Sequence, residues 1–185
     1  MKKIFLSLFV LLFTFGLFAE TGYAGVNWGA KREQLKYLFE DHPNTEDWKN
    51  TEVRLKMIQG EQTKVYYHFC DVLVGVSYTI PSSKTKKLIN IFKNCIDVVT
   101  IPTMTKEEAK ENLKIDFENK QESDIQINNA MFQTMAILDQ KGINQSDGKG
   151  LIWIFDYNED TRVYVIQDLI EGLTTVVYIV HEQDY

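Results

Sequence analysis

Few side chains in this sequence have the type and spacing that metal binding or catalysis requires. His68 and Cys70 stand two positions apart in an apolar run, so they can share one face of a strand as a pair of metal ligands would. Two ligands do not complete a site, and no cluster of Cys or His supplies the others. An ordinary strand histidine is therefore the favoured interpretation of His68.

The segment DYNED is the nearest approach to a calcium-binding loop. It places Asp156, Asn158 and Asp160 at alternate positions, but Thr161 stands where such a loop has glycine and Gln167 where it ends in glutamate. We therefore expect a polar hairpin turn here. No phosphate-binding loop and no Gly-x-Ser-x-Gly nucleophile motif is present. The sequence predicts no catalytic residue, no cofactor and no metal site.

The two cysteines, Cys70 and Cys95, raise the question of a disulfide. In an oxidising compartment they can pair. The bridge would close a loop of about 25 residues and stabilise the fold by about 3 kcal/mol on the chain-entropy model. The alternative is two buried free thiols, and the sequence leaves both open.

The pair Trp28-Gly29 joins a short apolar run to a charged helical pattern. Gly29 allows a sharp strand-to-helix turn that needs a positive φ. We expect Trp28 to pack its ring beneath the following helix and to fix the angle at which the chain enters it. A ligand-stacking Trp28 is the weaker alternative, because nothing polar converges near it in the sequence.

The N-terminus predicts export. Lys2 and Lys3 precede an apolar run of about fifteen residues and a small-residue exit, which together describe a secretory signal peptide over residues 1–19. Cleavage after Ala19 is favoured over cleavage after Ala24. The run is short for a membrane-spanning helix, and no cysteine offers a lipoprotein attachment. We expect a periplasmic or extracellular protein that is not lipid-anchored and has no integral membrane segment when mature.

The charge of the chain excludes some partners. The formal charge is −6 over 185 residues, and removal of Lys2 and Lys3 with the signal peptide makes the chain more acidic still. Nucleic acids and anionic membranes bind basic patches, so neither is an expected partner. The remaining length is enough for a real hydrophobic core.

The elements that must position these residues fall into two groups. In the first, helices are expected at 30–40 and 83–98 and strands at 52–58, 64–69 and 72–80, with Cys70-Asp71 as a hairpin connection. In the second, helices are expected at 106–119, opened by a capping box of Thr105 and Glu108, and at 128–142, ended by Gly142. Strands are then expected at 151–157, 161–167 and 174–181.

The two groups resemble each other. Glu61, Thr63, Val65 and Tyr66 recur as Glu159, Thr161, Val163 and Tyr164. A degenerate internal duplication explains this, and the general similarity of amphipathic strands is the alternative. We predict an α+β fold of two units, 20–100 and 101–185, each a helix laid on a three-stranded antiparallel meander.

The segment VNWGAKREQLK, residues 26–36, resembles the Trp-Gly strand-to-helix motif of small exported bacterial proteins of unknown function. VYYHFCDVLVGVSY resembles the hairpin that follows in those proteins, and AILDQKG with IWIFDYNEDTRVYV resembles their later helix, Gly turn and Trp-bearing strand. Lys31 stands where such proteins commonly have a Ser N-cap, so the helix should begin less firmly here. The resemblance implies no catalytic residues.

The leading functional hypothesis is an exported, non-enzymatic binding or adaptor module in the cell envelope or outside the cell. Its partner would be an unknown protein or envelope component that contacts aromatic strand residues, with Tyr66, Tyr67, Tyr157 and Tyr164 as candidates. One alternative is an exported hydrolase whose acids or His68 converge only in three dimensions. Another is an envelope structural protein held by an uncleaved N-terminus.

Overall fold

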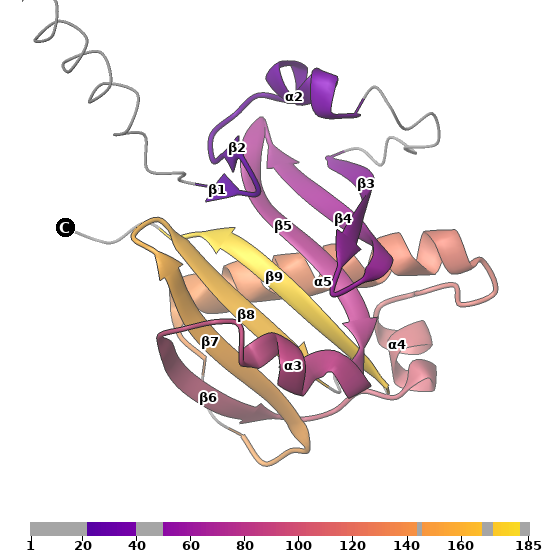
Figure 1. Ribbon diagram of the computed structural model, residues 1–185. Helices are drawn as coiled ribbons and strands as arrows, with labels where there is room; N and C mark the ends of the chain where they lie inside the picture. The colour runs from indigo at the N-terminus through magenta and orange to yellow at the C-terminus, as the bar shows by residue number, and fades with distance from the viewer. Residues whose placement is uncertain (1–21, 40–49, 144–145, 168–171, 182–185) are drawn as a thin grey trace, which may run out of the picture.

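The computed structural model describes residues 22–39, 50–143, 146–167 and 172–181, and the expected signal peptide lies outside these ranges. The strands are β1 Gly22–Tyr23, β2 Val26–Asn27, β3 Thr51–Ile58, β4 Glu61–Cys70, β5 Val72–Pro81, β6 Cys95–Ile101, β7 Gly150–Asn158, β8 Thr161–Gln167 and β9 Leu173–Val180 (Figure 1). The helices are α2 Arg32–Phe39, α3 Thr85–Ile89 with a preceding 3-10 turn η1 Ser82–Lys84, α4 Lys106–Asn112 and α5 Lys120–Lys141.

One antiparallel sheet runs through both halves of the chain. Its strand order is β3-β4-β5-β9-β8-β7-β6, and β1 and β2 form a separate two-stranded sheet. The middle of the large sheet is the pairing of β5 with β9, from Gly75 opposite Ile179 to Pro81 opposite Leu173. Because backbone pairing is continuous across this junction, the predicted α+β fold of two helix-plus-meander units is wrong. The protein is mostly β.

The largest local error is the helix expected at 83–98. Helix α3 ends at Ile89, and β6 begins at Cys95 after Asn94, which has a φ of 60°. Leu88 is buried on α3 as expected, but Ile96 lies exposed on β6. The β-branched run that follows Cys95 favours a strand, and its apolar residues happened to continue the helical spacing.

The capping box is present at the start of α4. The Glu108 backbone N–H donates to Thr105 Oγ1 at 3.2 Å, and the Thr105 N–H donates to Glu108 Oε2 at 2.8 Å. The helix nevertheless stops at Asn112 and does not reach 119. Helix α5 then begins at Lys120, well before the expected 128, and ends at Lys141, followed by the C-cap Gly142, whose φ is 78°.

Both faces of the large sheet are covered. Helix α5 lies along one face, here called the α5 face, and packs on β4, β5 and β9 (Figure 1). The opposite face, here called the α3 face, carries a core cluster that includes Leu88 of α3, Val26 of β2 and Leu35 of α2. A second cluster on the α5 face contains Ile127, Met131 and Met135 of α5. Because of this double cover, β9 is buried along six consecutive residues.

Trp28 and Gly29 tie the N-terminal turn to the sheet. Gly29 has a φ of 76°, the positive value that the turn argument requires, and its N–H donates to the Leu73 carbonyl at 3.0 Å. The Trp28 indole N–H donates to Thr161 Oγ1 on β8 at 2.7 Å. The half-buried Trp28 ring packs against the core cluster of the α3 face. Trp28 therefore anchors the turn to the sheet.

Candidate functional site

His68 is a core residue. Its side chain is buried, and its ring stacks on Phe132 of α5 with centroids 4.1 Å apart and planes 4° apart. Nε2 lies 2.8 Å from Ser77 Oγ, and the Ser77 hydroxyl donates to Asn128 Oδ1 at 3.0 Å, so Nε2–H is the donor. Burial lowers the pKa of His68 to about 3, which keeps the ring neutral. The His68 ring is thus enclosed in the core and offers no exposed nitrogen to a metal ion.

The DYNED segment, like His68, has a structural role. The Asp160 N–H donates to Asn158 Oδ1 at 3.0 Å in the turn between β7 and β8, as expected for a polar hairpin. Across the described ranges, no group of three or more His, Cys, Asp or Glu side chains is placed to hold a metal ion.

Cys70 and Cys95 are free and exposed, so they match neither the disulfide nor the buried thiols considered above. Cys70 ends β4 and Cys95 begins β6, and four strands separate β4 from β6 in the sheet. Five strand spacings amount to roughly 24 Å, whereas a disulfide needs Cα atoms within about 7 Å. The bridge is not formed in this structure, and within this sheet the two strands are too far apart for it.

A cluster around Asp139 joins α5 to the end of the sheet. The Asp139 carboxylate accepts from Arg162 Nη1 at 3.2 Å, lies 2.9 Å from His181 Nδ1, and accepts from the Tyr164 hydroxyl. Asp139, His181 and Cys70 all line one pocket. Within the described residues, however, no hydrogen bond joins the thiol of Cys70 to the imidazole of His181. A nucleophile–base pair is therefore not assembled, and the cluster is best explained as an anchor for α5.

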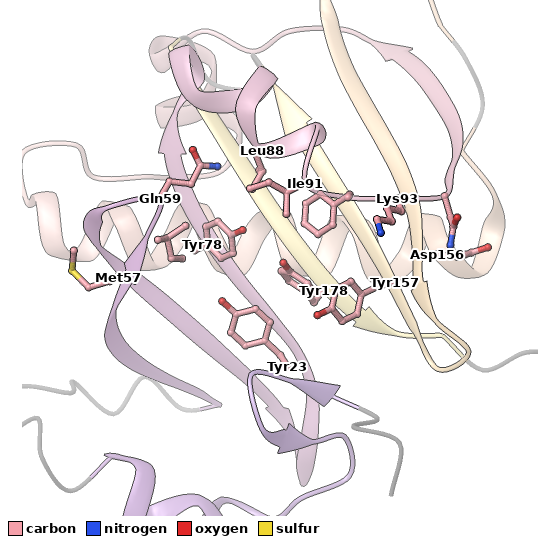
Figure 2. A pocket seen from close by; sticks show the side chains of 13 residues that line it. Tyr23, Met57, Gln59, Tyr78, Leu88, Ile91, Lys93, Asp156, Tyr157 and Tyr178 are labelled. Carbon is pink, nitrogen blue, oxygen red and sulfur yellow. The ribbon is translucent and has the colours of Figure 1, made fainter. Parts of the chain in front are cut away.

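A different pocket, of about 540 Å³, opens on the α3 face. We call it the tyrosine pocket after its aromatic wall, which consists of Tyr23, Tyr78, Phe92, Tyr157 and Tyr178 (Figure 2). These rings come from five separate parts of the chain: β1, β5, the segment after α3, β7 and β9. Aromatic rings on one side of the sheet and apolar side chains around α3 thus enclose a space that the core does not fill.

The rings of the wall meet edge to face. Tyr178 is at the centre, 4.7 Å from Tyr23 at 60°, 5.8 Å from Tyr157 at 85° and 6.2 Å from Phe92 at 62°, measured between ring centroids and planes. Edge-to-face pairs are the favoured geometry for aromatic rings. The wall is thus held together by its own contacts and does not need a ligand to form.

The hydroxyl groups of Tyr23, Tyr78 and Tyr178 keep their protons. Burial raises the pKa of Tyr78 to about 12, and burial with neighbouring tyrosines raises the pKa of Tyr23 and Tyr178. A hydrogen bond joins Tyr78 and Tyr178. The hydroxyls are therefore available to a ligand as neutral donors and acceptors at any physiological pH.

Gln59 adds an unpaired amide at the pocket lining. It sits in the turn between β3 and β4 with a φ of 50°, followed by Gly60 at 82°, the positive pair that such a two-residue hairpin needs. Both its amide nitrogen and its amide oxygen are buried and have no partner among the described residues. A buried amide without partners is costly, and this one belongs to a residue that lines the pocket.

The rim of the tyrosine pocket carries three large apolar side chains. Met57 is 69% exposed, Ile91 is 60% exposed and Tyr157 is 52% exposed, and all three line the pocket. Large apolar side chains gathered at one exposed place commonly mark a binding site. The polar groups deeper inside would then orient whatever the rim admits.

Sequence reasoning found only one residue of this pocket. Tyr157 is exposed there, but Tyr66, Tyr67 and Tyr164 are each 1% exposed, so the expectation that they form a partner surface is wrong. They lie in strands that are covered on both faces. The sequence did not indicate Tyr23 and Tyr178 as pocket residues, because no local pattern shows that β1 and β9 lie together.

Comparisons with known proteins add no assignment: no family model matches the chain, and no curated protein or solved structure shows significant similarity to it. The resemblance to exported Trp-Gly proteins therefore stays a prediction. None of the helices in the described ranges is both long enough and apolar enough to cross a bilayer.

Proposed function

We propose that this protein is a non-enzymatic binding protein that takes a small, largely apolar ligand into the tyrosine pocket. The observation that supports this most directly is an open pocket of about 540 Å³ with an aromatic wall and an apolar rim. Ligand sites in proteins are concave, mostly apolar and about 300–1,000 Å³ in volume, with a few polar groups that set orientation. The tyrosine pocket has each of these properties.

The hydrolase alternative receives less support. His68 is buried in the core and contacts no carboxylate, so the expected convergence of His68 with acids does not occur among the described residues. His181 and Asp139 interact, but outside the tyrosine pocket. Wall hydroxyls that remain protonated are suited to hydrogen bonding and unsuited to nucleophilic attack.

The proposed place of action is the cell envelope or the exterior of the cell. This part of the proposal rests on the basic and apolar start of the sequence, which lies outside the described residues. A binding protein in that compartment would meet its ligand in water. The exposed rim residues Met57, Ile91 and Tyr157 are then the first side chains that a ligand contacts.

The test is binding of a neutral fluorescent probe, N-phenyl-1-naphthylamine, to the folded protein. We expect saturable binding at one site with a rise in probe fluorescence. Tyr157→Ala should weaken it about two- to tenfold, because a lost aromatic contact is worth about 0.5–1.5 kcal/mol. Tyr157 is exposed enough for the fold to tolerate its removal.

Ile137→Ala is the matched control. Ile137 is 51% exposed, like Tyr157, but lies on α5 and does not line the pocket. Its replacement should leave probe binding unchanged. Equal affinity for the parent and Tyr157→Ala, or no saturable binding at all, would refute the proposal.

A further inference from the structure

We infer that the ligand of the tyrosine pocket is a single-chain amphiphile with a carboxylate head, such as a fatty acid or an arylalkanoate. The inference rests on the proposed function and names the ligand class. It follows from the charges and hydrogen-bonding groups around the pocket. They determine which polar end a ligand can have, and the apolar lining determines which body it can have.

Two lining residues carry a charge, and only one of these charges is open to a ligand. The Asp156 Oδ1 atom is 3.3 Å from Arg162 Nε, so its carboxylate is paired. Lys93 is exposed, and no ion pair holds it within the described part of the chain. Figure 2 shows Lys93 at the end of the pocket where Tyr157 lies. The available charge at the rim is therefore positive.

A second ammonium group lies behind the wall. Lys56 Nζ is 5.3 Å from the centroid of the Tyr23 ring and 5.6 Å from that of Tyr67. Lys56 does not line the pocket, but a partly buried positive charge one ring away still favours an anion in the pocket over a cation. An ammonium ligand among these rings would face Lys93 and Lys56 and no unpaired carboxylate.

The hydrogen-bonding groups favour the same head group. The Lys93 ammonium has donors only, and the hydroxyl of Tyr157, at the same end of the pocket in Figure 2, is a further donor. The amide of Asn94, which also lines the pocket, can donate as well. A carboxylate has acceptors only, and charge-assisted bonds from ammonium and hydroxyl donors are the stronger kind.

The rest of the pocket suits one apolar chain. The lining also includes Ile58, Leu88 and the exposed Met57, and Figure 2 shows Met57 at the opposite end of the pocket from Lys93. Methionine adapts its shape to flexible apolar ligands. A carboxylate held near Lys93 would therefore leave its apolar part against these side chains and the tyrosine rings.

The test compares three ligands with the same eight-carbon chain: octanoate, 1-octanol and octylammonium. Each is titrated against the bound N-phenyl-1-naphthylamine probe at pH 7.5 and low ionic strength. We expect octanoate to displace the probe at a concentration at least tenfold lower than octylammonium. Octanoate should also act at a lower concentration than 1-octanol, although the alcohol is the more hydrophobic of the two.

Lys93→Met isolates the charge. It should weaken octanoate about two- to fivefold, the range expected for one exposed charge pair, and leave 1-octanol unchanged. Lys87→Met is the matched control, because Lys87 is an exposed lysine on α3 that does not line the pocket. It should leave all three ligands unchanged.

The outcomes separate the two proposals. Octanoate no better than 1-octanol, octylammonium better than either, or an equal effect of Lys93→Met on acid and alcohol would overturn the carboxylate inference. In each of these cases the pocket still binds a ligand, and the proposed function stands. Absence of probe binding together with absence of binding by all three ligands, measured by calorimetry, would overturn both.

Discussion

The buried His68 makes the stability of this protein depend on pH in a defined way. The ring is 4% exposed, stacked on Phe132 and bonded to Ser77, and its pKa falls to about 3 because burial disfavours the charged form. In the unfolded chain a histidine titrates near 6.5. Between these two values the unfolded state binds a proton that the folded state does not.

The size of the effect follows from linkage. The pKa of His68 is lower in the folded state than in the unfolded state. Its destabilising effect is therefore absent above about pH 6.5, and stability is lost as pH falls from there toward 3. Each pH unit inside this window costs about 1.4 kcal/mol. From pH 7.5 to pH 4.5 the free energy of unfolding should therefore fall by about 3 kcal/mol through His68 alone.

Urea unfolding of the parent and of His68→Gln at pH 7.5, 6.5, 5.5 and 4.5 measures this directly. The glutamine amide can still donate to Ser77 but does not titrate, so the variant should lack the loss of about 3 kcal/mol whatever its absolute stability. His181→Gln is the control and should keep the loss, because His181 lies at the sheet end and contacts Asp139 instead. Parallel pH curves for the parent and His68→Gln would show that His68 does not carry the effect.

Two further predictions concern packing. Trp28→Ala should lower the free energy of unfolding by about 3 kcal/mol, of which Thr161→Val reproduces about 1 kcal/mol by removing the acceptor of the indole N–H. If Trp28→Ala unfolded in urea like the parent but no longer bound the naphthylamine probe, the structural role of this residue would be wrong. Gly75→Ala should cost about 1–3 kcal/mol, because a Cβ there would lie 2.0 Å from the ring of Phe132 and 2.8 Å from the Tyr178 carbonyl oxygen. An Ala variant as stable as the parent in thermal melting would show that α5 can move away from the sheet.

Local patterns predicted the hairpins well. The strands at 52–58, 64–69 and 72–80, and those at 151–157, 161–167 and 174–181, all occur with small shifts at their ends. Their turns carry the residues that such turns need, as at Gln59-Gly60 and Asn158. The capping box of Thr105 was also visible, because it depends on residues only three apart.

The helices were harder to place. The start of α5 contains Ile125 and Ile127, two buried residues with a strand-like spacing, so the helix was recognised only from 128 onward. Both isoleucines are buried because α5 lies flat against the sheet and covers a wide stripe. A helix with such a stripe does not show the narrow repeat that sequence reasoning looks for.

The candidate site could not be predicted for a different reason. Tyr78 and Tyr178 stand on β5 and β9, and their proximity depends on a strand pairing between the two halves of the chain. No local pattern specifies which strands pair at such a distance. Sequence reasoning also treated strand tyrosines as exposed on one side, whereas the central strands are buried on both faces and lose the two-residue alternation.

The position of β9 has a consequence for the order in which the protein can assemble. It is the last strand in the sequence but lies in the middle of the sheet, between β5 and β8. Its contacts with β5 close loops of about 100 residues, and such long-range pairings slow folding because closure entropy is lost before the contacts form. Until β9 arrives, the inner edges of β5 and β8 have no partner, and unpaired edges invite pairing with other chains. On the export route that we propose, the chain would expose those edges until β9 emerges, so a chaperone that shields strand edges should raise its folding yield.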